Sequence, residues 1–364
     1  MWQRRAIVQK KLVSLQVARG LAAMMVFVMH LFNMAAATTA SAWAAKIAQA
    51  LHYVGHIGVD IFFVLSGVVM CLVLSRAVAY EQTGRGRIAV AADFLARRAV
   101  RIYPLYWITL IACLLLPPIP GADNALGTLL HHPASFFLFS KPAAHPVAWT
   151  LVYEVQFYCA AALLLLFGHF AKKAFLIWSV LQIFLVVWSC VGLLPRWPIF
   201  DPLSLEFSLG VFVGLVSKVN FYRMECVGIA VAIGAACSAS LWWGGDAIAA
   251  HSYLRVIFWG LPAAVFIASL MAYERTHALQ YSFMARLGDL SYSLYMWHPI
   301  ALLVPLVLLQ PWNKGGSIKI TLIYCMLSIA LTFILSIISY RYIEKPLNGL
   351  FKLVRDRKRI SSHL

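Results

Sequence analysis

Two ionisable side chains, Arg19 and His30, lie within an apolar stretch that runs from Leu12 to Asn33. They are eleven residues apart, close to three turns of an α-helix, so both project from one face with about 16 Å between them along the axis. A charge inside a membrane-spanning helix is costly and usually marks a functional site. We therefore expect a polar track along this helix, from the cytoplasmic side toward the imidazole of His30, which is suited to general base catalysis.

Two carboxylates are candidates to assist that imidazole. Asp60 lies near the start of the apolar segment GVDIFFVLSGVVM, and Glu154 lies within the segment AWTLVYEVQFYC. We expect both acids at the depth of His30, where a carboxylate can hold an imidazole in one tautomer and raise its basicity. Asp60 can equally cap the N-terminus of its helix. An embedded Glu154 must be paired, protonated or hydrated, and we favour a role in acceptor binding or proton transfer.

A pair of arginines predicts an anion site. Arg98 and Arg101 are three residues apart, so they share one face of a helix at the expected cytoplasmic edge of the membrane. Paired guanidinium groups bind phosphate through bidentate hydrogen bonds. The alternative is anchoring by basic and aromatic side chains at the interface, which we accept for the neighbouring Arg97.

Membrane spans are the elements that must position these residues. The 364 residues are 62% hydrophobic and 12% charged, with a mean hydropathy of +0.82, which excludes an ordinary soluble domain. Apolar stretches of about 20 residues are long enough to cross the hydrocarbon core. We predict an all-α integral membrane bundle of about ten transmembrane helices, with approximate bounds 12–35, 57–76, 101–118, 149–169, 174–194, 204–217, 226–243, 253–272, 288–309 and 320–340.

The net charge of +17 lies mainly in the loops between these spans, so we expect no nucleic-acid partner. Lys and Arg concentrate in alternate segments, and the positive-inside rule then predicts that both termini are cytoplasmic. We predict a transmembrane domain over residues 1–345 and a basic cytoplasmic tail over 346–364 that contacts anionic membrane lipid. The first span is too long and too polar for a cleavable signal peptide, so we expect it to be retained.

Other polar residues give weaker signals. His145 and two further loop histidines have no regular spacing with acids or thiolates, so we predict no metal site. His298 precedes Pro299, and we slightly favour a structural role at this backbone break over a catalytic one. Glu206 is expected to face a polar gap in the short sixth span. The segment GDLS, from Gly288 to Ser291, is interpreted as a helix entrance rather than a hydrolase motif.

Six segments resemble, in order, the signatures of the membrane acyltransferase 3 family. They read LQVARGLAAMMVFVMH, GVDIFFVLSG, RRAVRIYPLYW, WTLVYEVQFY, GDLSYSLYMWHP and YRYIEKP. The family's Arg-x10-His motif matches Arg19 and His30, and its Arg-x-x-Arg motif matches Arg98 and Arg101. The first segment and WTLVYE are most similar to the exopolysaccharide O-acyltransferases of the succinoglycan type.

This resemblance implies a ten-helix bundle, multi-pass in the bacterial inner membrane, that O-acylates a glycan or lipid-linked sugar for cell-surface polysaccharide. The group transferred is usually acetyl. Many members of the family add an esterase-like domain after the last span. We expect this chain to lack one, so that it transfers the group with its membrane part alone or passes it to a partner in the polysaccharide-synthesis machinery.

The donor expected on this basis is acyl-CoA, namely acetyl-CoA, with no metal. Arg98 and Arg101 would hold its phosphates, and Arg19 would stabilise it deeper in the membrane. His30, oriented by Asp60 or Glu154, would then act as general base on the acceptor hydroxyl or become transiently acylated itself. The sequence leaves both routes open.

Two other classes of protein also fit the pattern. Buried Arg, His, Asp and Glu are typical of a proton-coupled transporter, here an exporter of a polysaccharide precursor or acyl group, although no internal repeat supports it. A membrane scaffold for polysaccharide synthesis is the weaker alternative.

Overall fold

The computed structural model describes residues 12–39, 41–81, 86–118, 124–195, 197–216, 225–277, 279–313 and 316–361. Every regular element in these ranges is helical, which confirms the predicted all-α class. The basic residues expected at the cytoplasmic N-terminus, before Leu12, lie outside the described residues.

The helices follow the apolar stretches of the sequence. The longer ones are α1 (Val13–Ala36), α2 (Ala42–Glu81), α3 (Arg87–Leu115), α5 (Trp149–Leu165), α6 (Ala171–Cys190), α7 (Leu205–Val216), α8 (Glu225–Trp242), α11 (Leu261–Thr276), α12 (Phe283–Leu309), α13 (Ile318–Ser339) and α14 (Lys345–Ser361). The short α-helices are α4 (Ala125–His131), α9 (Gly245–Ala250) and α10 (Ser252–Arg255). Single 3₁₀ turns are η1 (Pro133–Phe137), η2 (Gly168–Phe170), η3 (Pro198–Phe200), η4 (Pro202–Ser204) and η6 (Gln310–Trp312), and the π-helical turns are η5 (Val256–Gly260) and η7 (Tyr340–Glu344).

Seven helical segments in the described part of the chain are long and apolar enough to cross a membrane. Three shorter apolar helices, Trp149–Leu165, Pro202–Val216 and Val227–Ser240, fall where three further spans are expected. The protein is therefore an apolar, all-helical polytopic membrane protein, and the full count of ten spans stays a prediction.

The expected bounds are wrong at two helices that carry site residues. Helix α2 begins at Ala42 rather than near residue 57, so it extends well beyond the expected span. Helix α3 begins at Arg87, which places Arg98 and Arg101 in its middle rather than at its entrance. Polar and basic residues continue both helices because a helix needs apolar side chains only where it contacts lipid or core.

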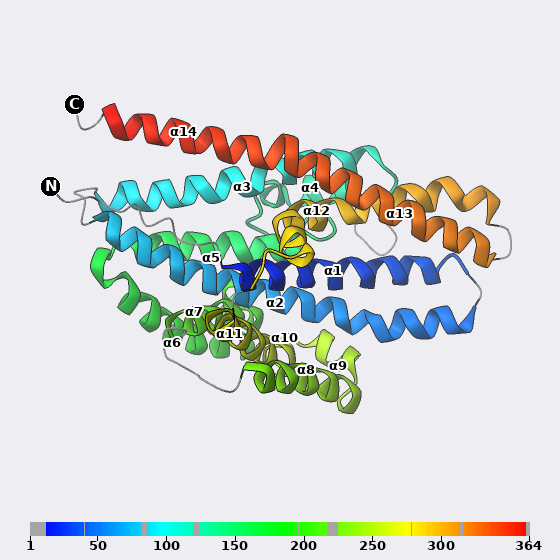
Figure 1. The fold of residues 1–364 in the computed structure, drawn as a ribbon, viewed down its shortest axis with the longest axis horizontal. Helices are drawn as coiled ribbons and strands as arrows, with labels where there is room; N and C mark the ends of the chain where they lie inside the picture. The colour runs from blue at the N-terminus through cyan, green and yellow to red at the C-terminus, as the bar shows by residue number, and fades with distance from the viewer. Residues whose placement is uncertain are drawn as a thin grey trace.

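Helices α1 and α2 lie side by side at the centre of the molecule (Figure 1). Helix α12 packs on α1, α13 packs on α12, and α7 packs on α2. From α13 through η7 to α14 the chain forms one long rod that ends on the same side as the end of α2 and the start of α3 (Figure 1). The segment from α8 to α10 lies along the lower edge of the molecule in Figure 1, opposite α14.

Glycines bring the backbones of α1 and α12 into direct contact. A Cβ atom on Gly20 would lie 2.3 Å from the carbonyl oxygen of Met284, and one on Gly288 would lie 2.0 Å from that of Gln16. Small residues at such crossings let membrane helices pack by van der Waals contact, since lipid provides no hydrophobic drive between helices. This close contact fixes the position of α1 along its axis relative to α12.

A second glycine crossing joins α2 to α7. A Cβ on Gly67 would lie 2.0 Å from the carbonyl oxygen of Phe207, and one on Gly210 would lie 1.9 Å from that of Val64. At the start of α1, the carboxylate of Glu274 on α11 accepts hydrogen bonds from the backbone N–H groups of Val13, at 2.8 Å, and Ser14, at 2.9 Å. An anion at these free N–H groups stabilises the helix N-terminus.

We expect Gly288→Ala to destabilise the protein by about 1–3 kcal/mol, because the added methyl must push α1 away from α12. The measurement is the midpoint of thermal unfolding of the purified protein in detergent. Gly234→Ala on α8 is the matched control, because a Cβ at Gly234 meets no atom within 4 Å. Equal midpoints for the two variants would show that the crossing tolerates a side chain.

Candidate active site

Three of the predicted arginines and one predicted carboxylate meet in a single cavity. Arg19 of α1, Arg98 and Arg101 of α3 and Glu154 of α5 all line it, and the cavity volume is about 80 Å³. The rest of the lining comes from α2, α3, α5 and α12: Val59, Phe62, Phe63, Leu65, Ser66, Val69, Ile102, Thr150, Leu151, Tyr158, Ser291, Tyr292 and Tyr295. The structure thus brings Arg19 to the same cavity as Arg98 and Arg101, although the two motifs are some eighty residues apart.

The cavity carries more positive than negative charge. Among the described residues, no carboxylate lies within ion-pair distance of Arg19, Arg98 or Arg101. The guanidinium of Arg98 lies over the ring of Tyr158, 4.9 Å from its centroid, in a cation–π contact. Glu154 accepts a hydrogen bond from the Tyr158 hydroxyl and a longer one, of 3.4 Å, from Ser66. Such an excess of guanidinium groups favours an anionic ligand.

Arg97 differs from its neighbour Arg98, as expected. Its guanidinium forms an ion pair with Asp93 one turn earlier on α3, and it does not line the cavity.

Glu154 lies with the arginines, and this corrects one expectation. The sequence placed it at the depth of His30 and Asp60, but its carboxylate is bonded to Tyr158 and Ser66 beside Arg98 and Arg101. A helix pattern gives the face of a residue but not the neighbouring helix that this face meets.

Ser291 was expected at a helix entrance, but it lies well inside α12 and lines the cavity. Its hydroxyl is buried and has no hydrogen-bond partner. Thr150 and Tyr295, also in the lining, bond to each other through their hydroxyls at 2.9 Å. These groups add three hydroxyls to the polar part of the cavity wall.

Glu344, which the sequence did not single out, interacts with one of the cavity arginines although it is outside the lining. It ends the π-helical turn η7, accepts a hydrogen bond from the hydroxyl of Ser293, and interacts electrostatically with Arg101. Such turns are rare and often occur at functional sites. The available signal was an acid in the segment YRYIEKP, next to a strongly basic helix.

His30 does not line this cavity. Its ring lies beside that of His298 on α12, with the centroids 5.1 Å apart. The ring of Tyr295, which does line the cavity, lies 5.7 Å from that of His298. The imidazole of His30 is thus separated from the cavity wall by these rings, and it is partly buried.

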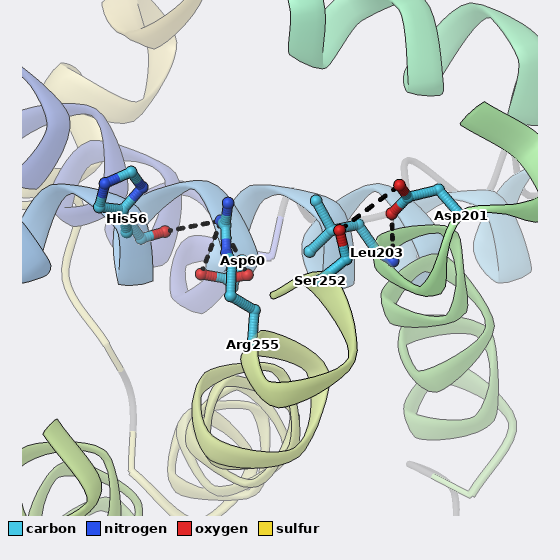
Figure 2. Close-up of polar contacts among 6 residues, drawn as sticks. All are labelled: His56, Asp60, Asp201, Leu203, Ser252 and Arg255. Carbon is cyan, nitrogen blue, oxygen red and sulfur yellow. Dashed lines mark hydrogen bonds and ion pairs between the residues drawn. The ribbon is translucent and has the colours of Figure 1, made fainter. Parts of the chain in front are cut away.

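Asp60 has a different partner from the one expected. Its two oxygens accept hydrogen bonds of 3.0 and 3.1 Å from one terminal nitrogen of Arg255, which also contacts the carbonyl of His56 at 3.5 Å (Figure 2). Both side chains are buried, and no hydrogen bond joins Asp60 to His30. The proposed Asp60–His30 pair is therefore wrong, because a fully buried carboxylate takes the strongest cation within reach.

Arg255 belongs to a second polar cluster on the far side of α2 from the cavity. Glu206 of α7 is fully buried there and interacts with both Asp60 and Arg255. Its two carboxylate oxygens have no hydrogen-bond partner, and they press against Gly260, where a Cβ would lie 2.8 Å from one of them. Asp201 accepts a hydrogen bond from Leu203 N–H at 3.0 Å and a long one from Ser252 at 3.4 Å (Figure 2).

His145 is not an ordinary loop residue. It is completely buried, and its Nδ1 accepts a hydrogen bond of 3.4 Å from the backbone N–H of Val147. Burial lowers the pKa of His145 to about 3, with the backbone carbonyl of Met296 acting in the opposite direction, so this imidazole is neutral at physiological pH. It anchors the loop before α5 against α12.

No group of three or more His, Cys, Asp or Glu side chains in the described ranges is arranged to hold a metal ion. The cavity therefore offers guanidinium groups, hydroxyls and one carboxylate for chemistry.

Membrane helices, a half-buried arginine cluster and an imidazole nearby are compatible with a membrane-bound acyl-transfer enzyme. The acyltransferase domain of the acyltransferase 3 family matches residues 12–341, and the chain belongs to that family. It is an O-acyltransferase.

Two relatives have informative names. The chain is similar to the exopolysaccharide production protein ExoZ of Rhizobium meliloti (strain 1021), with 29% identity over 81% of this chain and 90% of that protein. It is also similar to the putative peptidoglycan O-acetyltransferase YrhL of Bacillus subtilis (strain 168), with 26% identity over 80% of this chain and 50% of that protein. The match therefore spans about half of YrhL. No solved structure matches the chain.

We expect Arg255→Met to lower the free energy of unfolding by about 3–5 kcal/mol, because it leaves the buried Asp60 carboxylate beside Glu206 without a cation. Asp60→Asn combined with Arg255→Met should be less destabilising than Arg255→Met by itself, since the uncompensated charge is gone. A double-mutant cycle of thermal unfolding in detergent measures this coupling. Simple additivity of the two substitutions would contradict the ion pair.

Proposed function

We propose that this protein transfers an acyl group, most simply acetyl, from cytoplasmic acyl-CoA to a hydroxyl of a glycan or lipid-linked sugar. The observation that carries the proposal is the cavity lined by Arg19, Arg98 and Arg101, none of which is neutralised by a carboxylate ion pair within the described chain. Acyl-CoA is an anion with phosphates at one end and a thioester at the end of a long arm, which suits a cavity lined by guanidinium groups and hydroxyls.

The cavity has room for several water molecules and not for a whole coenzyme A arm. Donor binding therefore requires side chains in its wall to move. The rings of Phe62 and Tyr295, with centroids 5.9 Å apart, both line the cavity, and Tyr295 also contacts His298. We expect the thioester end of the donor to displace these rings on its way to His30.

His30 acts as the general base in this proposal. It takes the proton from the acceptor hydroxyl as the oxygen attacks the thioester carbon. The carbon–sulfur bond then breaks, and the imidazolium returns the proton to the departing thiolate. Arg19 stabilises the negative charge of the donor, and Glu154 keeps the Tyr158 hydroxyl and Arg98 in place at the cavity. The geometry gives no support to a catalytic role for Asp60.

The orientation that we propose has ten spans with both termini in the cytoplasm. The end of α2, the start of α3 and the end of α14 lie on one side of the molecule (Figure 1). That agrees with the basic segments around residues 85–101 and 341–359, both of which the positive-inside rule assigns to the cytoplasm.

The acceptor class is supported by the names of the relatives. One is named for exopolysaccharide production and the other for peptidoglycan O-acetylation, and both polymers are hydroxyl-rich glycans. We therefore expect a surface glycan, or its lipid-linked precursor, to be the acceptor, in the bacterial inner membrane.

The direct test uses purified protein in detergent with acetyl-CoA labelled in the acetyl group and a lipid-linked oligosaccharide or isolated polysaccharide. An enzyme consumes acetyl-CoA and yields a base-labile glycan ester without a membrane gradient. A transporter would need sealed vesicles and a gradient, and activity under those conditions only would overturn the proposal.

We expect Arg19→Ala and His30→Ala each to abolish acyl transfer while the protein still inserts in the membrane. Arg19 supplies charge to the donor cavity, and His30 supplies the base. The measurements are ester content of cell-surface polysaccharide by NMR and the amount of membrane-inserted protein by immunoblot. Near-normal ester content with either variant would refute its assigned role.

We expect Arg98→Ala to raise the KM for acyl-CoA about 10- to 100-fold, the effect of losing a hydrogen bond to a charged group. The KM for the acceptor should change little, because the acceptor meets His30 and not the arginines. Arg97→Ala is the matched control, since Arg97 is paired with Asp93 outside the cavity. Equal increases in both KM values for Arg98→Ala would argue against a phosphate-binding role.

A further inference from the structure

A catalytic imidazole needs a group that fixes which of its nitrogens carries the proton. In the described part of the chain neither nitrogen of His30 forms a hydrogen bond, and the predicted carboxylate partner, Asp60, is bonded to Arg255. The contact that His30 does make is with the ring of His298, at 5.1 Å between centroids and 31° between ring planes.

The hydrogen bonding of His298 defines its own tautomer. Its Nδ1 lies 3.3 Å from the carbonyl oxygen of Leu294, one turn earlier on α12. A carbonyl can only accept, so Nδ1 carries the proton, and in the neutral ring Nε2 is left with a lone pair. That Nε2 is buried and has no hydrogen-bond partner, although His298 is completely buried.

A buried nitrogen without a partner costs free energy unless something satisfies it in the working protein. The rings of His30 and Tyr295 both contact the ring of His298, with centroid distances of 5.1 and 5.7 Å. The hydroxyl of Tyr295 is already used, since it bonds with Thr150 at 2.9 Å and the carbonyl of Val147 at 3.1 Å. His145 also acts on His298, but the backbone of Met296 interacts with its imidazole, which leaves His30 as the adjacent ring without a partner of its own.

We propose that His298 is the positioning residue for His30: its Nε2 accepts a hydrogen bond from one ring nitrogen of His30 and leaves the other nitrogen free to take the acceptor's proton. This inference rests on the proposed function of His30 as general base. It replaces the structural role at Pro299 that the sequence favoured for His298.

The arrangement gives His298 a defined part in the proton transfer. When His30 takes the proton from the acceptor hydroxyl it becomes an imidazolium, and both of its nitrogens then donate. One donates to the lone pair of His298, which stays neutral, and the other returns the proton to the leaving thiolate. A hydrogen bond to a charged donor is stronger than one to a neutral donor, so the contact stabilises the charged state.

Other side chains near His30 are less suited to this task. His52 interacts electrostatically with His30, but its Nδ1 lies 3.1 Å from the amide nitrogen of Asn33. His56 stacks on Trp259, with the ring centroids 5.9 Å apart. His298 differs from both because its free nitrogen is buried and its ring is held by the backbone of its own helix.

The test compares three substitutions at this position, His298→Gln, His298→Asn and His298→Leu. The carbonyl oxygen of a glutamine reaches about as far as Nε2 of histidine, whereas that of an asparagine reaches only as far as Nδ1. Each protein is purified in detergent and checked for unfolding midpoint, and kcat and KM for acetyl-CoA are measured with the same glycan acceptor.

We expect His298→Asn and His298→Leu to lower kcat about 10- to 100-fold with the KM for acetyl-CoA unchanged, since the lost bond is one to a charged group. His298→Gln should keep most of kcat. Comparable kcat values for the Gln and Asn variants, or a loss that tracks the unfolding midpoint, would overturn the inference, and this comparison stands even if His298→Leu fails to fold. His30→Ala is measured alongside: activity in that variant would defeat the proposed function, whereas an inactive His30→Ala with unaffected His298 variants would defeat only this inference.

Discussion

The backbone contact between α1 and α12 is the constraint on which the site depends. Gly20 and Gly288 let the two helices touch without intervening side chains, and α1 is held on its other side by α2. One helix therefore carries Arg19 into the cavity and His30 to the side of His298 at a fixed separation along its axis. The acyl transfer proposed above needs this rigidity, because such chemistry tolerates little misplacement of the reacting groups.

Burial of charge divides the molecule into two polar regions on either side of α2. On one side Asp60 and Arg255 neutralise each other, and Glu206 lies against them. On the other side the arginines of the cavity have only Glu154 among them. The cation of the first region is already paired with a carboxylate of the protein, so that region does not require an added anion. The second has an excess of positive charge that an anionic ligand can neutralise, which is the physical basis for placing the donor there.

Rare backbone geometry occurs beside both regions. The π-helical turn η5 follows Arg255 directly, and η7 ends at Glu344. Each π-helical turn lies next to a charged residue that bonds to another helix, Arg255 to Asp60 and Glu344 to Ser293. Such turns often occur at functional sites. The ring of Tyr295, which lines the cavity and packs against Phe62, also contacts the ring of His298, so one aromatic side chain joins the cavity to the histidines.

The sequence by itself determined the helical membrane class, most span positions, the family and the residues of the arginine cavity, because hydropathy and short spacings are local properties of the chain. The sequence could not determine which side chains contact one another in the folded protein. Asp60 bonds Arg255, Glu154 bonds Tyr158, and His30 meets His298, each across helices far apart in sequence. Helical periodicity gives the direction in which a side chain points, but which helix lies opposite follows from packing of the whole bundle, and here the glycine crossings set that packing.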